Sequence, residues 1–457
     1  MLETIGVKSV DELISQVIPH SIRLKKPLAL PAEGDERVRI PGHIRALAER
    51  NRCLRSFIGM GYYPCAVPAA IVRNVFENPA WYTSYTPYQA EISQGRLEAL
   101  LNFQTAVISL TGMEIGNCSL LDEGTATAEA MLMMFALRSR EAVREGRNQL
   151  FVDRNIFPQT LDVLLTRSEP FGIELIVDEY DEYSFTGKEF GAIVQYPAAN
   201  GAVRDYTDFT AAAHAKGALV TAVADLLALA LLKAPANGAP TSPSARPSVW
   251  APDGAGGPSA GYMTTREAFK RNMPGRIIGV SVDRLGNRAL RMALQMREQH
   301  IKRERATSNI CTASALMASM VGFYCVYNGP EGLKRAADTA HLAAATVAKA
   351  LEAMDYKLAA TAYFDTLEVA AEAAVVQSLA LESGINFSTD RRFGAHVVRR
   401  SHDSGGDRRG HPHLAAAKGK KAKAVKPVTE SNVPAGLRRR SAYLTEPVFN
   451  AYRSKAP

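Results

Sequence analysis

The run from residue 81 to residue 104 is the part of the sequence richest in side chains that could bind a small molecule. One tryptophan and three tyrosines precede a Gln-Gly step, and the pattern that follows is typical of a helix. An aromatic, hydrogen-bonding loop that leads into a helix is a common part of a small-molecule site. The candidate site residues in this loop are Tyr82, Tyr85, Tyr88 and Gln89.

Asp225 ends the apolar run 220–224 and could have a second chemical role. In pyridoxal-phosphate enzymes an aspartate in that setting pairs with the pyridinium nitrogen, and a lysine some tens of residues later forms the Schiff base. An aspartate that ends a strand is more often a helix cap, so both interpretations stay open. Lys233 follows too closely, on the helix that we expect after Asp225, and the next lysine is Lys270. We therefore expect no Schiff-base lysine in this chain.

Two further polar segments could border a ligand. Residues 119–131 could form a helix N-terminus, which favours anions, but Asp122 and Glu123 disfavour a phosphate and fit an ordinary acidic first turn. Residues 297–309 hold a dense group of cations and hydroxyls together with Asn309. Such a group suits a solvated helix and the edge of an active site equally well.

Composition and charge limit the classes of function. A hydrophobic content of 47% and a charged content of 22% are ordinary for a globular protein, and no apolar run reaches the ~18–20 residues of a membrane span. Residues 391–440 hold 14 Lys and Arg against 3 Asp and Glu, so the rest of this chain of net charge +8 is net negative. That clustering disfavours nucleic-acid binding. The five cysteines are scattered without metal-ligand spacing, which predicts reduced thiols and no metal site. With an N-terminus that shows no leader, they predict a cytoplasmic protein. We interpret His214 as a surface residue.

The elements that must position these residues fall into three parts. Residues 1–120 are expected to be mostly helical, with a capping box at Ser9 and Glu12 and a helix that ends before Pro19. Residues 121–330 alternate helices with continuous apolar strands, which is typical of a mostly parallel sheet covered on both faces. Residues 331–457 are expected to form a smaller C-terminal domain and tail. The predicted strands are 150–152, 173–177, 191–196, 218–223 and 276–282, and the predicted helices are 96–110, 125–140, 158–167 and 206–216.

Over nearly its whole length the chain resembles the glycine decarboxylase family, the P-protein of the glycine cleavage system. The resemblance implies an α/β fold of the fold-type-I, aminotransferase-like class of pyridoxal-phosphate enzymes. It also implies that glycine is decarboxylated and that its aminomethyl group passes to the lipoyl arm of the H-protein. Besides the tyrosine segment, the matching blocks are 55–63, 119–131, 273–283, 297–301, 306–313, 433–439 and 447–454.

Members of this family are one long chain with two similar halves or two separate subunits, and the cofactor lysine belongs to the second half. This chain resembles the first half, which implies that it is inactive alone and that pyridoxal phosphate lies in a lysine-bearing partner. Asp225 would then be a vestigial counterpart of the catalytic aspartate. A frameshifted fragment of the single-chain enzyme and a non-catalytic binding or regulatory partner are the alternatives. The residues that would touch substrate or the interface are Tyr82, Tyr85, Tyr88, Gln89 and Asn309.

Two stretches, 235–260 and 393–413, keep roughly the family's length but lose its sequence. They could be flexible loops, although long structureless loops are uncommon inside a compact domain. The family pattern after Pro235 runs Gly-Glu-Trp-Gly-Ala-Asp-Ile. Written in GC-rich codons and read one base later, that pattern gives Ala-Asn-Gly-Ala-Pro-Thr-Ser, which is the sequence of residues 236–242. We therefore interpret both stretches as frameshifted translation, which also accounts for most of the basic excess.

Overall fold

The computed structural model divides the chain into two compact units, Met1–Cys53 and Leu54–Pro457. The expected three-part division at residues 120 and 330 stays a prediction. The residues that the structure describes are 1–26, 28–29, 39–52, 54–63, 65–83, 87, 89–238, 244–245, 260–294, 299–308, 313–388, 395–398, 412–420 and 425–452.

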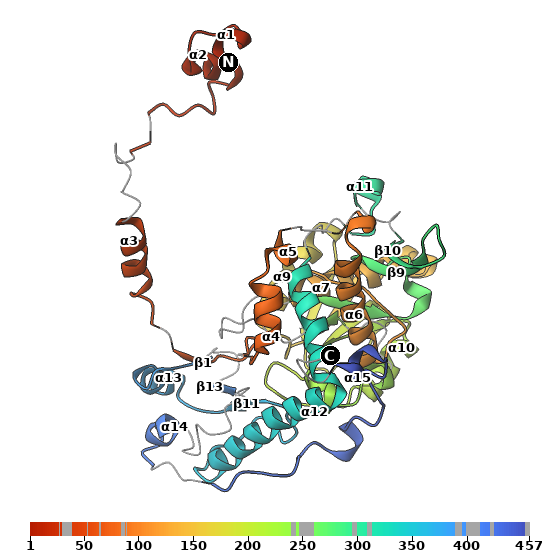
Figure 1. Ribbon diagram of the computed structural model, residues 1–457. Coiled ribbons are helices and arrows are strands. Elements are labelled where there is room, and N and C mark those ends of the chain that lie inside the picture. The colour runs from red at the N-terminus through yellow and green to blue at the C-terminus, as the bar shows by residue number, and fades with distance from the viewer. Residues whose placement is uncertain are drawn as a thin grey trace. The chain divides into compact units, whose positions relative to one another are not determined.

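The first unit is helical, as expected, and contains α1 (Leu2–Ile5), α2 (Val10–Val17) and α3 (Arg39–Ala48) (Figure 1). The Ser9 hydroxyl accepts a hydrogen bond from the Glu12 backbone N–H at 3.1 Å, and the Glu12 carboxylate accepts one from the Lys8 N–H at 2.8 Å. These bonds satisfy amide groups that a helix start leaves without a partner. The predicted Ser9 cap is confirmed, but the reciprocal bond of the capping box is not, because the Glu12 carboxylate accepts from the Lys8 N–H instead of the Ser9 N–H.

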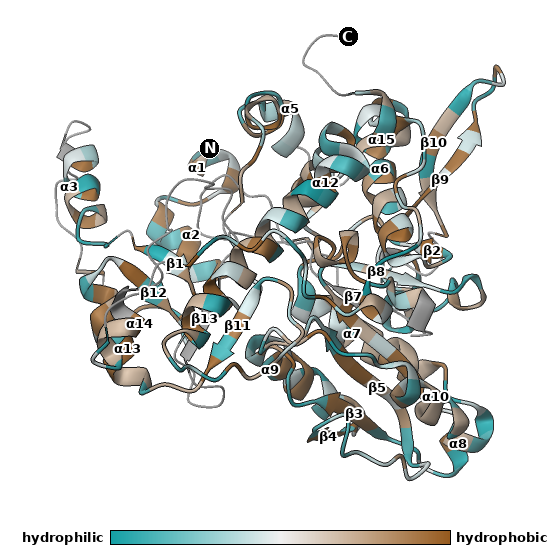
Figure 2. Ribbon diagram, turned by 90° about the horizontal axis from the view of Figure 1, so that it is seen from below, coloured by the Kyte–Doolittle hydropathy of each residue, from teal (hydrophilic) through white to brown (hydrophobic). Residues whose placement is uncertain are grey.

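The second unit contains a seven-stranded sheet in the order β2-β8-β7-β6-β5-β3-β4. Its strands are parallel except β8, which runs opposite to both of its neighbours. Every residue of β5 is buried, as a strand covered on both faces requires, and Figure 2 shows its predominantly hydrophobic colouring. The predicted mostly parallel sheet is confirmed. The strands are β2 (Ile115–Gly116), β3 (Gln149–Asp153), β4 (Glu174–Asp178), β5 (Glu189–Tyr196), β6 (Leu219–Ala224), β7 (Ser244–Ala245) and β8 (Tyr262–Thr265).

Alternate side chains of the central strands enter two different cores. Phe151 and Val194 pack with Phe209 of α10 on one face, whereas Val152 and Ile193 belong to the larger core on the other face. This alternation is the ordinary consequence of the two-residue period of a strand. The helices of this part are α6 (Gln94–Thr111), α7 (Glu123–Ala136), α8 (Arg140–Arg144), α9 (Pro158–Ser168), α10 (Thr207–Ala215) and α12 (Ala315–Glu352). Shorter helices are α4 (Ala69–Ile71), α5 (Pro79–Tyr82), α11 (Gln299–Lys302) and α15 (Val448–Ala451).

The strand predicted at 276–282 forms, but its expected place in the parallel sheet is wrong. β9 (Ile277–Val282) pairs with β10 (Arg288–Ala293) in a separate antiparallel hairpin. The Gln104 amide of α6 donates to the Ile278 carbonyl at 3.1 Å and accepts from the Ile278 N–H at 2.9 Å. Gln94 makes the same two bonds to Leu290 of β10, at 2.9 and 2.8 Å. Both outer edges of the hairpin are thus paired with glutamine side chains instead of strands.

A smaller α/β region has its own core. It combines β11 (Thr366–Val369), β12 (Ile385–Phe387), β13 (Ala395–Val398), α13 (Ala373–Glu382) and α14 (Pro412–Ala417) with β1 (Arg55–Phe57) from far earlier in the chain. β1 and β12 are parallel neighbours, with Phe57 opposite Phe387. The two odd stretches interpreted from the sequence contain β7 and β13, and most of their other residues lie outside the part that the structure describes.

Candidate functional site

A cleft of about 380 Å³, counted to its open mouth, lies at the carboxyl ends of β5 and β6. The carboxyl edge of a parallel sheet is where open α/β folds usually bind ligands. Polar side chains from several distant segments meet there. The cleft is lined by Gly61, Tyr63, Glu123, Phe157, Gln195, Tyr196, Pro197, Ala198, Val223, Ala224, Asp225, Asp365 and Thr366.

One wall of the cleft is a tight loop before α4. The φ values of Gly59, Met60 and Gly61 are 66°, 51° and 81°, which makes a left-handed run. The two glycines adopt this conformation without strain. The Met60 carbonyl accepts a hydrogen bond from the Gln159 amide at 2.9 Å, which holds this loop against α9. The loop leads to Tyr63, whose hydroxyl lies 3.1 Å from the Thr366 hydroxyl.

The first turn of α7 is acidic, as predicted. Asp122 caps the helix, since its carboxylate accepts a hydrogen bond from the Thr125 N–H at 2.7 Å. Glu123 is buried at the cleft and accepts a hydrogen bond from the Thr160 hydroxyl at 3.0 Å. A helix N-terminus attracts anions, but here the protein's own carboxylates take that position. The turn is therefore a poor phosphate site.

Asp225 follows β6 directly and is half-buried in the cleft. Its carboxylate accepts a hydrogen bond from the Leu227 N–H at 3.0 Å, and its own N–H donates to the Tyr196 carbonyl at 3.0 Å. The same side chain therefore caps a turn and lines the cleft, and its chemical role stays a prediction. Burial first, and then the nearby charge of Asp225, raise the pKa of Tyr262.

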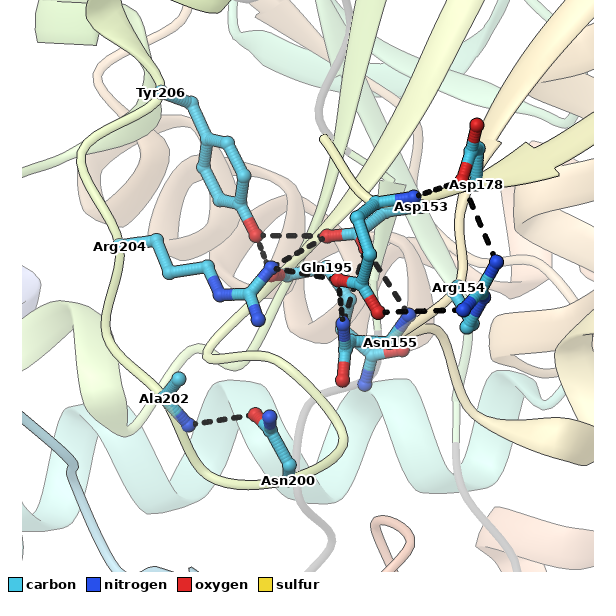
Figure 3. A network of polar contacts seen from close by, with 10 residues as sticks. Asp153, Arg154, Asn155, Asp178, Gln195, Asn200, Ala202, Arg204 and Tyr206 are labelled. Carbon is cyan, nitrogen blue, oxygen red and sulfur yellow. Dashed lines mark hydrogen bonds and ion pairs between the residues drawn. The ribbon is translucent and has the colours of Figure 1, made fainter. Parts of the chain in front are cut away.

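Beside the cleft, the ends of β3, β4 and β5 carry a buried polar network (Figure 3). Asp153 is fully buried and accepts hydrogen bonds from the Asn155 N–H at 3.0 Å and the Tyr206 hydroxyl at 3.2 Å. Arg204 lies 3.5 Å from the same carboxylate and 4.7 Å from the Tyr180 ring. Burial raises the pKa of Asp153, and these contacts oppose the rise. The network orders the sheet edge that faces the cleft.

Neither of the two lysines considered from the sequence lines the cleft. The expected helix through Lys233 is wrong, because the helical turn η4 (Ala228–Ala230) ends before Lys233. The backbone N–H of Lys233 instead donates to the Leu437 carbonyl. The Lys233 ammonium group donates to the Thr207 hydroxyl at 3.3 Å, and Lys270 pairs with Glu267. With no lysine among the lining residues and carboxylates at the helix start, this cleft does not fit pyridoxal phosphate.

The described residues of the tyrosine segment do not line this cleft. Tyr82 ends α5 with 52% of its surface exposed, while the neighbouring Trp81 packs edge-on against Phe323 with ring centroids 5.2 Å apart. Gln89 is exposed just before the helical turn η2 (Ala90–Ile92). Neither Tyr82 nor Gln89 is among the described residues that line the cleft. The other candidates, Tyr85, Tyr88 and Asn309, lie outside the described residues.

The polar segment near residue 300 contains α11 and the helical turn η8 (Arg303–Arg305), and it exposes Lys302, Arg303 and Arg305. Its Ser308 side chain forms a hydrogen bond with Glu129 of α7, which is only 2% exposed and lies 2.8 Å from Arg167. Burial raises the pKa of Glu129 against these contacts. Sequence reasoning missed Glu129; the signal was an isolated charge in an otherwise apolar stretch of helix.

Within the described ranges, no three His, Cys, Asp or Glu side chains are grouped as metal ligands. No helix in that part of the chain is both long and apolar enough to cross a bilayer. His214 is half-buried on α10, and burial lowers its pKa.

Comparison with known sequences identifies relatives along the whole chain. A family profile described as the glycine cleavage system P-protein matches residues 1–397. A protein of Flavobacterium johnsoniae named glycine dehydrogenase (decarboxylating) is 49% identical over 459 residues, which cover 100% of this chain and 48% of that protein. The chain thus spans about half the length of the curated relatives that it matches.

Comparison with solved structures also finds a glycine cleavage system P-protein. A crystal structure of glycine decarboxylase (P-protein) of the glycine cleavage system, in inhibitor-bound form, matches with a TM-score of 0.79 and 32% identity. The match covers 92% of this chain and 97% of that one. A sphingosine-1-phosphate lyase of Burkholderia pseudomallei is 14% identical with a TM-score of 0.57 over 89% of this chain and 96% of that chain, a similarity of fold alone. The predicted fold-type-I architecture is confirmed.

Proposed function

Because the chain belongs to the glycine cleavage system P-protein family, we propose that it is the half of a glycine decarboxylase that does not hold the cofactor. In this proposal a lysine-bearing second half binds pyridoxal phosphate and decarboxylates glycine. The aminomethyl group then passes to the lipoyl arm of the H-protein. This chain is inactive alone and supports the second half from across their interface.

The observation that carries the proposal is the chemistry of the cleft at the carboxyl edge of the sheet. A catalytic fold-type-I half needs a lysine for the Schiff base, and no lysine is among the residues that line this cleft. The helix start that could hold a phosphate is instead capped by Asp122, with Glu123 buried beside it. Asp225 has kept its place after β6 but also caps a turn. These features fit a vestigial site.

The two described residues that contact substrate in this proposal, Tyr82 and Gln89, are exposed and do not line the cleft. Tyr82 is more than half exposed although its neighbour Trp81 is packed, which leaves the phenol free to meet another surface. Gln89 is also exposed, on the loop that follows. We assign Tyr82, Tyr85, Tyr88, Gln89 and Asn309 to the entrance of the partner's site.

The second candidate is a piece of one long chain. It is favoured by the share of the relatives that this chain spans, 48% of the Flavobacterium protein, and by the two odd stretches. Resequencing from codon 230 to several hundred bases past codon 457 separates the two. An open frame into a lysine-bearing half supports the single chain, and a stop followed by a new start supports a separate subunit.

Reconstitution tests the proposal directly. The chain is co-expressed with the lysine-bearing half and H-protein, and the exchange of bicarbonate carbon into glycine is measured. Exchange is expected only when both halves are present; activity of this chain alone would contradict the proposal. A cytoplasmic location is part of the proposal. Cys118 and Cys325 are buried and form no disulfide within the described part of the chain, which fits a reducing compartment.

A further inference from the structure

Glu129 is a buried carboxylate to which the proposed function gives no role. It lies in α7 between the buried residues Ala128 and Ala130, and only 2% of its own surface is exposed. Burying a carboxylate costs free energy unless hydrogen bonds and an opposite charge compensate it. Its two partners are the guanidinium group of Arg167 in α9, 2.8 Å away, and the hydroxyl group of Ser308. The interior of α7 thus holds a residue from far along the chain.

The contact with Ser308 is one of two places where the following part of the chain is attached to α7. The Ser314 hydroxyl donates to the Leu121 carbonyl at 2.7 Å, and the Ser314 N–H donates to the Leu120 carbonyl at 3.2 Å. Both carbonyls belong to residues directly before the cap of α7. The chain therefore meets α7 or its start at residue 308 and again at residue 314, and the first of these attachments depends on Glu129.

The two partners of Glu129 differ in what they need from it. The Arg167 side chain is 28% exposed, so its charge can turn toward water when the pair is broken. A buried ion pair often adds no more stability than apolar side chains of similar size would. Ser308 is half-buried and uncharged, and Glu129 fixes its hydroxyl group. The distinctive effect of Glu129 is therefore on the position of Ser308.

We infer that Glu129 is a positioning residue for the reaction and acts by holding Ser308. The inference rests on the proposed function, in which Asn309, the next residue in the sequence, belongs to the entrance of the partner's site. A side chain that meets a second chain binds best when its backbone is already ordered, because ordering it on binding costs free energy. Glu129 supplies this order at Ser308 from within its own chain.

A double-mutant cycle tests this role. Glu129→Met removes the carboxylate but keeps a side chain of similar length, and Ser308→Ala removes the hydroxyl group without changing α7 or α9. Glu129→Gln keeps an oxygen that can accept the Ser308 hydrogen bond. Thr307→Ala is the matched control, since Thr307 is exposed beside Ser308.

Two measurements are made on each variant. With H-protein and a saturating amount of the lysine-bearing half, the exchange of bicarbonate carbon into glycine gives kcat and the KM for glycine. On this chain alone, hydrogen exchange of the backbone amides of residues 303–308 reports how firmly that segment is held.

We expect Glu129→Met and Ser308→Ala each to raise KM about tenfold and to change kcat by less than about threefold, because both remove the same hydrogen bond at the entrance. The double variant should also raise KM about tenfold, since two changes that break one contact are not additive. Glu129→Gln and Thr307→Ala should change KM by less than about threefold. Both single variants that break the contact should speed amide exchange at residues 303–308 by about tenfold or more.

Two results would overturn the inference and leave the proposed function intact. One is an additive effect of the two substitutions on KM, and the other is a KM that neither substitution changes, whatever the amide exchange shows. Amide exchange at residues 303–308 that neither substitution speeds would also overturn it, because Ser308 would then not be held by Glu129. A wild-type chain that gives no bicarbonate exchange with the lysine-bearing half would overturn the proposed function and the inference together.

Discussion

Arg439 joins the C-terminal tail to the large core through an unusual set of contacts. Its guanidinium group donates to the carbonyls of Leu110 at 2.6 Å and Leu229 at 2.9 Å. It also donates to the carbonyls of Ser109 at 3.1 Å and Ser441 at 3.0 Å. Ser109 and Leu110 belong to the last turn of α6, where carbonyl groups lack partners within the helix and favour a cation.

Among the described residues, no carboxylate forms an ion pair with Arg439. Burial lowers its pKa to about 10, so the group is still protonated at pH 7. That shift from 12.5 corresponds to about 3 kcal/mol of desolvation. Each hydrogen bond to a charged group contributes about 1.5–3 kcal/mol, and four of them exceed the desolvation cost.

Replacing Arg439 by Met should therefore lower the free energy of unfolding by about 3–5 kcal/mol. Arg439→Lys should cost about half as much, because one ammonium group cannot reach all four carbonyls. Arg440→Met is the matched control, since Arg440 is exposed one position further on. Urea unfolding followed by circular dichroism measures the change, and limited proteolysis reports release of the tail. A loss below about 1 kcal/mol for Arg439→Met, or one equal to the control, would refute the reasoning.

Three other substitutions test the packing described above. Gln104→Ala leaves the N–H and carbonyl of buried Ile278 without their partner, so it should cost about 2–4 kcal/mol in urea unfolding and speed hydrogen exchange at that amide. Gly201→Ala should cost about 3 kcal/mol or more by the same assay, because φ is 86° and a Cβ there would overlap the Thr366 carbonyl. Burial lowers the pKa of His341, so the contribution of this residue to stability is complete above pH 6.5 and is lost as pH falls. His341→Gln should therefore reduce the dependence of the urea unfolding midpoint on pH between pH 8 and pH 5.

Local sequence rules predicted much of the central sheet. Four predicted strands match observed ones. The runs 150–152 and 191–196 lie within β3 and β5, and the runs 173–177 and 218–223 lie within β4 and β6 except for their first residues. They were predictable because each run is bounded by strong helix or turn signals. The hairpin and the pairing of β1 with β12 were not predicted. Both depend on contacts between distant segments, such as Gln104 with Ile278, that no local pattern records.

The candidate site divides in the same way. The acidic first turn at Asp122 and Glu123 follows from residue types beside an apolar helix, so the sequence predicted it, whereas the capping bond of Asp122 comes from the structure. The position of Lys233 was misjudged because the apolar run before it reads equally well as a helix and as a buried turn. Asp153, Arg204 and Tyr206 come from separate elements, and only the fold brings them together.

The central claim is that this chain completes a glycine decarboxylase without holding its cofactor. The most direct measurement is the incorporation of isotope-labelled bicarbonate into the carboxyl group of glycine, with H-protein present throughout. The account predicts incorporation when this chain and the lysine-bearing half are mixed, and none with either half alone. Incorporation by this chain alone, or by the lysine-bearing half at an undiminished rate without it, would contradict the account.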